Sequence, residues 1–280
     1  MLWTVLLAAM AGCAVSPIDV PTSAPAVTAT HAVPPSPTLV PTSPPPPTAT
    51  PLPPDTGWMN LHPGIEVRSL DVAAGQFTER ITVARIDPAV VRLEVFYVPR
   101  IAYPVSGWAR QLGALLVVNG GYFTPEQIVT GLTVVDGQPY GTPFGDYAGM
   151  VAVGPDETVS VRWLRTRPYD PAEPLKSAIQ SFPMLVHPGG GVGFPSDGDD
   201  GRTSRRTVVA QDQEGRLLFL IAPRGYLSLH ALSVWLAGSD LDIDVALNLD
   251  GGTSSGFWMT GGPQIDSLIS VPVAIGVFAR

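Results

Sequence analysis

Two segments of the sequence end an apolar run with a polar side chain and a pair of glycines. They are residues 116–121 (LVVNGG) and residues 247–252 (LNLDGG). Glycine pairs permit positive φ and let backbone N–H groups approach a ligand with no Cβ in the way. In parallel sheets, ligands bind beyond the carboxyl ends of strands. We therefore predict that both segments contribute to one site, although Asn and Asp also occur in ordinary tight turns and would explain either tripeptide alone.

Two other patterns resemble catalytic or metal-binding motifs, but the residues that those motifs also require are missing. Residues 252–256 (GTSSG) match the nucleophile elbow of serine hydrolases, but no histidine follows His230, so the required order of catalytic residues is missing. Asp197, Asp199 and Asp200 resemble part of a calcium loop, but Gly201 and Arg202 occupy positions that such a loop gives to other residue types. The histidines are not spaced as metal ligands. We expect no cofactor, and a divalent cation has no assignable ligands.

The elements that would position these segments are mostly strands. Residues 90–98 (VVRLEVFYV) alternate with period two, and strands are also predicted over 81–85, 150–153, 159–163, 207–210 and 271–279. Ser106 is expected to cap a short helix, and Ser228 a longer one between buried strands at 217–221 and 243–249. That order predicts a βαβ unit with parallel strands. We predict an α+β fold with a large mixed β-sheet and a few helices, including this βαβ unit near the C-terminus.

The first 57 residues are predicted to be an export signal followed by a disordered linker. Residues 1–12 (MLWTVLLAAMAG) are typical of a signal peptide, and residues 10–13 resemble the lipobox whose cysteine, here Cys13, is lipidated after cleavage. An ordinary signal peptide containing a cysteine is the alternative. Residues 13–57 are rich in Pro and Thr and favour an extended, disordered linker. We predict an exported protein, anchored to the cell envelope as a lipoprotein, with its folded domain over residues 58–280.

Composition excludes several classes of protein. The formal net charge is −8, the isoelectric point is near 4.9, and Lys176 is the single lysine. A chain this acidic lacks the positive surface that phosphate backbones require, so we expect no nucleic-acid partner. One cysteine excludes a disulfide scaffold and multi-cysteine metal sites. No apolar run after Met10 approaches the roughly 18 to 20 residues of a membrane span.

Three motifs occur in an order that resembles a known family. They are residues 118–123 (VNGGYF), then Arg206-Thr207 entering a strand, then residues 246–255 (ALNLDGGTSS). Together they resemble the phosphodiester glycosidase family, which is related to the lysosomal enzyme that removes N-acetylglucosamine from a phosphodiester-linked mannose. The resemblance extends over about residues 102–280 and includes 178–181 (AIQS). Tyr122 stands where the family usually has phenylalanine, Thr253 where a third glycine is usual, and Phe182 near a position that is often glycine.

The resemblance implies a site for a sugar phosphodiester. Asp250 is the expected catalytic carboxylate, and Arg206 the expected phosphate ligand, because a guanidinium can bind phosphate through two hydrogen bonds. The residue pattern alone would favour a surface arginine beside Arg205, and the resemblance favours the role in the site. Glu126 and Asp146 are both candidates for a second carboxylate. The substrate-binding residues that the resemblance implies are Asn119, Gly120, Gly121, Gln180, Thr207, Asn248, Gly251, Gly252, Ser254 and Ser255.

The leading functional hypothesis is therefore a surface-tethered hydrolase. It would cleave the glycosyl–phosphate bond of a sugar-1-phosphodiester in a glycopolymer or a nucleotide-sugar-like substrate, with a carbohydrate phosphodiester and the membrane as its partners. The alternative is a non-catalytic envelope module that binds glycan or peptidoglycan through the same residues. The hydrolase requires that Asp250 and Arg206 share one site, and the binding module does not.

Overall fold

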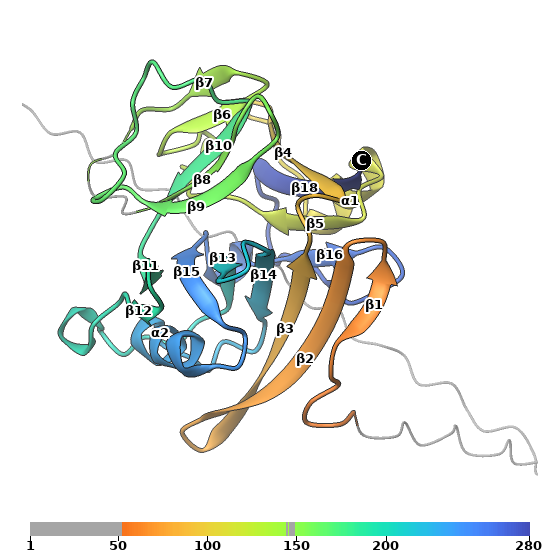
Figure 1. The fold of residues 1–280 in the computed structure, drawn as a ribbon, viewed down its shortest axis with the longest axis vertical. Helices are drawn as coiled ribbons and strands as arrows, with labels where there is room; N and C mark the ends of the chain where they lie inside the picture. Colours follow the sequence, from red (N-terminus) through yellow and green to blue (C-terminus); the bar gives the residue numbers. More distant parts are fainter. Residues whose placement is uncertain (1–51, 144, 146–148) are drawn as a thin grey trace, which may run out of the picture. The chain divides into compact units, whose positions relative to one another are not determined.

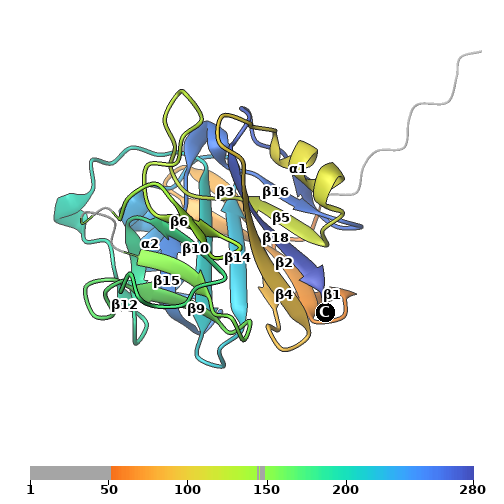
Figure 2. The same ribbon diagram turned by 90° about the horizontal axis from the view of Figure 1, so that it is seen from above.

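Three β-sheets and two α-helices make up the part of the chain that the structure describes (Figures 1 and 2). The structure is a computed structural model and describes residues 52–143, 145 and 149–280. Signal peptide, Cys13 and most of the predicted linker lie outside these residues. The predicted α+β class with few helices is confirmed.

The largest sheet has eight strands. In spatial order they are β1 (Met59–His62), β2 (Ile65–Ala74), β3 (Phe77–Ile86), β14 (Leu217–Ala222), β13 (Arg206–Asp212), β15 (Ile243–Asn248), β11 (Met184–His187) and β12 (Gly191–Val192). The long β2–β3 hairpin extends at one edge of the molecule in Figure 1. Strands that lie 100 or more positions apart in the sequence, such as β3 and β14, are hydrogen-bonded neighbours here.

Two further sheets have five strands each. One runs in the order β7 (Gln138–Tyr140), β6 (Thr133–Val135), β10 (Ser177–Ser181), β8 (Gly149–Val153) and β9 (Val159–Trp163). The other runs in the order β17 (Gln264–Ile265), β16 (Phe257–Met259), β5 (Leu116–Asn119), β18 (Val273–Ala279) and β4 (Val91–Tyr97). Neighbouring strands pair antiparallel throughout the described residues.

The predicted βαβ unit is present, with one strand inserted between its two strands. Helix α2 (Leu229–Gly238) connects β14 to β15, and the Ser228 hydroxyl accepts a hydrogen bond from the Ala231 N–H, which confirms the predicted cap. Both strands are antiparallel to β13, which lies between them, so they run parallel to each other without touching. Strand β13 begins at Arg206, which therefore lies at the carboxyl ends of the neighbouring strands β14 and β15.

Strand β14 is apolar throughout because both of its faces are buried. Leu217, Phe219 and Ile221 face the main core shared by the three sheets, whereas Leu218 and Leu220 face the core beneath helix α2. Alternate side chains point to opposite faces of a strand, so a strand that is covered on both sides needs apolar residues at every position. The continuous apolar run in the sequence is the signature of this central position.

Helix α1 (Val105–Leu112) is capped differently from the prediction. Ser106 lies inside its first turn, and the residue at the cap position is Pro104, which offers no side-chain cap. Instead, Asp266 Oδ1 accepts from the Ser106 N–H at 2.9 Å and Ser267 Oγ from the Val105 N–H at 3.1 Å. The free N–H groups at a helix start can be satisfied by any acceptor nearby, and here the acceptors come from 160 residues further along the chain.

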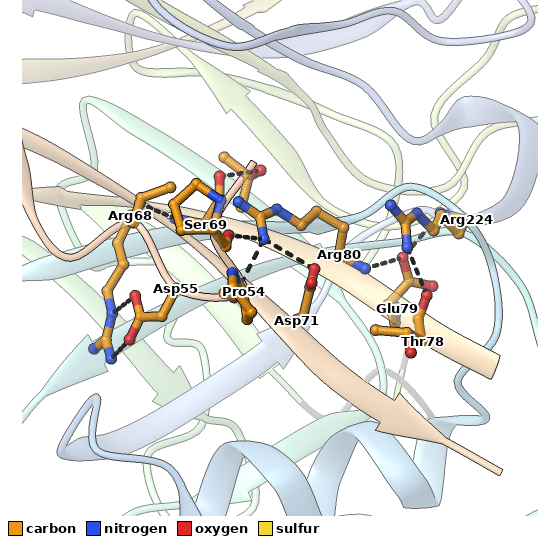
Figure 3. A network of polar contacts seen from close by, with 12 residues as sticks. Pro54, Asp55, Arg68, Ser69, Asp71, Thr78, Glu79, Arg80 and Arg224 are labelled. Carbon is orange, nitrogen blue, oxygen red and sulfur yellow. Dashed lines mark hydrogen bonds and ion pairs between the residues drawn. The ribbon is translucent and has the colours of Figure 1, made fainter. Parts of the chain in front are cut away.

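The last residues of the segment predicted as linker are hydrogen-bonded to the β2–β3 hairpin (Figure 3). Asp55 binds Arg68 of β2 through two hydrogen bonds of 2.9 and 2.7 Å, and Pro54 accepts from the backbone N–H of Asp71. Arg80 Nη1 donates to the Pro53 carbonyl and to the Asp71 carboxylate. The Arg68 guanidinium lowers the pKa of Asp55 to about 2. The chain thus joins the sheet at Pro53.

No described helix combines the length and the apolar character that crossing a membrane requires.

Candidate active site

The two glycine-rich turns are bonded directly to each other. Asn119 ends β5 in a five-stranded sheet, and Asp250 follows β15 in the eight-stranded sheet. The Asn119 Nδ2 donates to the Asp250 carbonyl at 2.7 Å, and the Asp250 N–H donates to the Gly120 carbonyl at 3.1 Å. The two turns therefore contribute to one place although their strands belong to different sheets. Hydrogen bonds between the two sheets bring the turns together.

The side-chain amide of Asn119 is hydrogen-bonded to other residues of the protein. Its Oδ1 accepts from Thr207 Oγ1 at 2.7 Å and from the Gly256 N–H at 3.0 Å, while its Nδ2 holds the Asp250 carbonyl. Asn119 is 1% exposed and Thr207 is fully buried. These two residues, which the resemblance implies in substrate binding, tie β5, β13 and the turn after β15 to one another.

The Asp250 carboxyl is partly buried, and no arginine, lysine or histidine of the described residues forms an ion pair with it. The Ser254 hydroxyl and the Gly251 N–H donate hydrogen bonds to this carboxyl, which favour its charged form. Burial has the larger effect and raises the pKa of Asp250 to about 6. A carboxyl with such a pKa exchanges its proton readily near neutral pH, which is the property that a general base or acid needs.

Arg206 lies beside the same turn, and no carboxylate of the described residues forms an ion pair with it. A Cβ added to Gly251 would lie 3.6 Å from Arg206 Nη1, and Arg206 Nη2 donates to the Arg202 carbonyl at 3.2 Å. Its Nε is buried and has no partner among the described residues. Burial lowers the pKa of Arg206, with opposing effects from Tyr122, Asp199 and Asp200. Arg206 does not shift the pKa of Asp250, so the two side chains do not form an ion pair.

Asn248 connects the turn to two aromatic residues. Its Nδ2 donates to the Tyr122 hydroxyl at 3.0 Å and to the carbonyls of Phe182 and Leu249 at 3.1 and 2.7 Å. Its Oδ1 is buried and has no partner among the described residues. The amide orientation follows from these contacts, because an oxygen at the Nδ2 position would face two carbonyl oxygens.

The backbone N–H groups of the glycines are mostly engaged within the protein. Gly120 donates to the Val273 carbonyl at 2.9 Å and Gly252 to the Arg205 carbonyl at 2.8 Å. A Cβ on Gly121 would lie 2.9 Å from Ile179 Cγ2. The expectation that these N–H groups donate to a ligand is therefore not met by Gly120 and Gly252. Close packing, not ligand access, explains why Gly121 has no side chain.

Two further residues that the resemblance implies in substrate binding, Gln180 and Ser255, are buried. Gln180 Oε1 accepts from the Leu132 N–H at 3.3 Å, and the buried Ser255 hydroxyl has no partner among the described residues. The sequence gives no sign that Arg205 differs from a surface arginine, but in the structure its side chain holds two backbone segments together. Its Nη2 donates to the carbonyls of Ser255 and Asp266, both at 2.9 Å.

The structure selects no second carboxylate. Glu126 is fully exposed, and its pKa is lowered by a hydrogen bond from Thr124, which is the opposite of what a general acid needs. Asp146 lies outside the described residues. Among residues 52–143, 145 and 149–280, no group of three or more His, Cys, Asp or Glu side chains is arranged to hold a metal ion.

Known proteins resemble this chain in sequence pattern and in fold. The family model of phosphodiester glycosidases matches residues 112–278, more than half of the chain. The chain therefore belongs to the phosphodiester glycosidase family. Membership indicates a hydrolase that acts on phosphodiester-linked sugars. A search among curated protein sequences finds no match.

Three solved structures have a similar fold at low sequence identity. A zebrafish N-acetylglucosamine-1-phosphodiester alpha-N-acetylglucosaminidase catalytic domain, auto-inhibited by its pro-peptide, has a TM-score of 0.63 and 18% identity over 78% of this chain and 85% of its own. A hypothetical protein from Synechocystis has a TM-score of 0.62 and 17% identity over 82% of this chain, which spans 64% of that protein. A Burkholderia pseudomallei protein has a TM-score of 0.54 and 15% identity, with 73% and 75% of the two chains covered.

Proposed function

We propose that this protein is a surface-tethered glycosidase that hydrolyses the glycosyl–phosphate bond of a sugar-1-phosphodiester. The observation that carries the proposal is the partly buried carboxyl of Asp250, whose pKa is about 6, next to a turn flanked by the guanidinium of Arg206. A site built only to bind neutral sugar would need neither group. The substrate class follows from the family and from the chemistry of these two side chains.

The chemistry divides between the two residues. Arg206 binds the phosphate and stabilises the phosphate monoester as it leaves with the electrons of the C1–O bond. Asp250 in its charged form stabilises the positive charge that develops on the sugar ring and takes a proton from the attacking water. The water oxygen bonds to C1, and Asp250 returns the proton to solvent. Because a phosphate monoester is already a stable anion, little help from a general acid is required.

The test is hydrolysis by the full chain in water enriched in ¹⁸O. UDP-N-acetylglucosamine and a panel of sugar-1-phosphodiesters are the substrates, and free sugar and the phosphate product are measured by mass spectrometry. Cleavage of the C1–O bond releases UDP that contains no ¹⁸O, whereas attack at phosphorus would label the phosphate. Asp170→Asn, at an exposed turn, serves as a control that keeps activity. Sugar binding with no release from any substrate would favour the non-catalytic binding module.

The tether is proposed from the sequence and tested separately. Lipidation of Cys13 would hold the chain at a membrane, and residues 14–52 would separate the domain from that surface. We expect Cys13→Ala to move the protein from the membrane fraction to the soluble fraction of cells. Equal membrane association of the two forms would refute lipidation and would leave the proposed hydrolysis untouched.

A further inference from the structure

Two aromatic side chains stand next to the proposed site without belonging to its chemistry. Tyr122 follows the first glycine pair and Phe182 follows β10, and their ring centroids are 5.2 Å apart at an angle of 44°. Phe182 is 39% exposed, which is unusual for a phenylalanine beside a well-packed core.

Hydrogen bonds hold this aromatic pair in position. The Tyr122 hydroxyl donates to the Phe182 carbonyl at 2.9 Å and accepts from Asn248 Nδ2 at 3.0 Å. The Asn248 N–H donates to the Pro183 carbonyl at 3.0 Å. Asn248 lies two residues before Asp250, so the same strand end carries the reactive carboxyl and supports the aromatic pair. A phenylalanine at position 122 could make none of the hydroxyl contacts.

The pair also lies close to the arginine of the site. Tyr122 opposes the effect by which burial lowers the pKa of Arg206, and a Cβ on Gly251 would lie 3.6 Å from Arg206 Nη1. Phe182 exposes an aromatic ring to solvent while its backbone carbonyl contacts Asn248, two residues before Asp250. The C–H face of a sugar ring carries partial positive charge and packs well on the electron-rich face of an aromatic ring.

We propose that Phe182 forms the wall against which the sugar ring of the substrate packs, and that the Tyr122 hydroxyl is the positioning group that fixes this wall through Asn248. The inference rests on the proposed function and deepens it, because it assigns sugar selectivity to residues other than Asp250 and Arg206. The ligand class is a pyranose with an apolar C–H face. Phosphate recognition stays with Arg206.

The experiment separates sugar recognition from phosphate recognition. KM and kcat are measured with the full chain for the sugar-1-phosphodiester that it cleaves best, and inorganic phosphate is tested as an inhibitor. We expect Phe182→Ala to raise KM about tenfold, equivalent to about 1.4 kcal/mol, while the phosphate inhibition constant stays unchanged. Phe182→Leu keeps apolar volume without a flat face and is expected to raise KM nearly as much.

Tyr122→Phe tests the positioning role by removing one hydroxyl. We expect KM to rise about threefold and the preference among glucose, galactose and N-acetylglucosamine phosphodiesters to narrow, with phosphate inhibition unchanged. Tyr226→Phe is the matched control, because Tyr226 is an exposed tyrosine stacked on Phe77 of the β2–β3 hairpin. It should change neither quantity. Thermal unfolding of each variant confirms that the fold is retained.

The outcomes distinguish this inference from the proposed function. If KM and sugar selectivity are unchanged in folded Phe182→Ala and Phe182→Leu, the proposed packing of the sugar on Phe182 is wrong, and the proposed hydrolysis is unaffected. If the wild type cleaves no phosphodiester, the free sugars are tested by calorimetry. Sugar binding that Phe182→Ala abolishes would then support the wall and reject the proposed hydrolysis. Sugar binding that survives in Phe182→Ala would overturn the wall.

Discussion

The two glycine-rich strand ends share a sequence pattern but differ in how their polar side chains are used. At the end of β5, Asn119 is 1% exposed and its amide is hydrogen-bonded to Asp250, Thr207 and Gly256. At the end of β15, the Asp250 carboxyl is held by Ser254 and Gly251, with a pKa of about 6. A neutral amide can both donate and accept, so it joins buried segments without burying charge. A partly buried carboxyl with no ion-pair partner remains poised to exchange a proton.

The largest expected effect is the loss of activity in Asp250→Asn. The amide keeps the shape of the side chain but cannot take a proton or balance positive charge on the sugar. We expect kcat to fall about 10³-fold or more, which corresponds to about 4 kcal/mol of transition-state stabilisation. Phosphate inhibition through Arg206 should persist. A fully active Asp250→Asn enzyme would remove Asp250 from the proposed chemistry and erase the contrast between the two strand ends.

Asn119→Ala should act on the fold rather than on the chemistry. The substitution leaves the Asp250 carbonyl, the Thr207 hydroxyl and the Gly256 N–H without their shared partner. An unsatisfied buried polar group costs at least about 1 kcal/mol, so the loss of a partner by three groups should lower the free energy of unfolding by about 3 kcal/mol or more. Urea denaturation measures this change. A variant of unchanged stability that has lost only substrate affinity would show instead that Asn119 is a ligand.

Stability should depend on pH through Asp250. Its pKa rises from 3.8 to about 6 on folding, so between these values the folded state holds more protons than the unfolded state. The free energy of unfolding should therefore fall as pH rises from about 4 to 6, by up to about 3 kcal/mol. The difference between wild type and Asp250→Asn, followed by urea denaturation at each pH, isolates this contribution. If the difference is the same at pH 4 and pH 7, the carboxyl is not held in this environment.

The glycines of the two turns provide the smallest and most direct contrast. A Cβ on Gly121 would lie 2.9 Å from Ile179 Cγ2, so Gly121→Ala should lower the free energy of unfolding by about 2 kcal/mol. A Cβ on Gly251 would lie 3.6 Å from Arg206 Nη1, which is ordinary contact, and 3.1 Å from the Arg205 carbonyl. The approach to the carbonyl is tight but less close than that of Gly121, so Gly251→Ala should lower the free energy of unfolding by less than Gly121→Ala and should also lower activity, because its methyl lies next to Arg206. Equal stability losses in the two variants would argue against different uses of the two turns.

Local patterns in the sequence predicted much of the secondary structure. Predicted strands at 159–163 and 90–98 correspond to β9 and β4, and Ser228 caps α2 as expected. These features depend on residues close together in the chain, where periodicity and capping preferences act. The Ser106 cap failed because Asp266 and Ser267 supply its acceptors from a distant segment. Arg205 was missed for the same reason, since its partners are the carbonyls of Ser255 and Asp266.

The sequence by itself indicated several of the strands, the βαβ unit and membership in the phosphodiester glycosidase family. Only the tertiary structure decided which polar side chains remain available to a substrate. Asn119 finds its partners 88, 131 and 137 positions away in Thr207, Asp250 and Gly256. Sequence spacing does not encode such contacts. Because a buried polar group must find a partner or lose free energy, packing of the sheets fixed Asn119 as a structural joint and left Asp250 with its raised pKa.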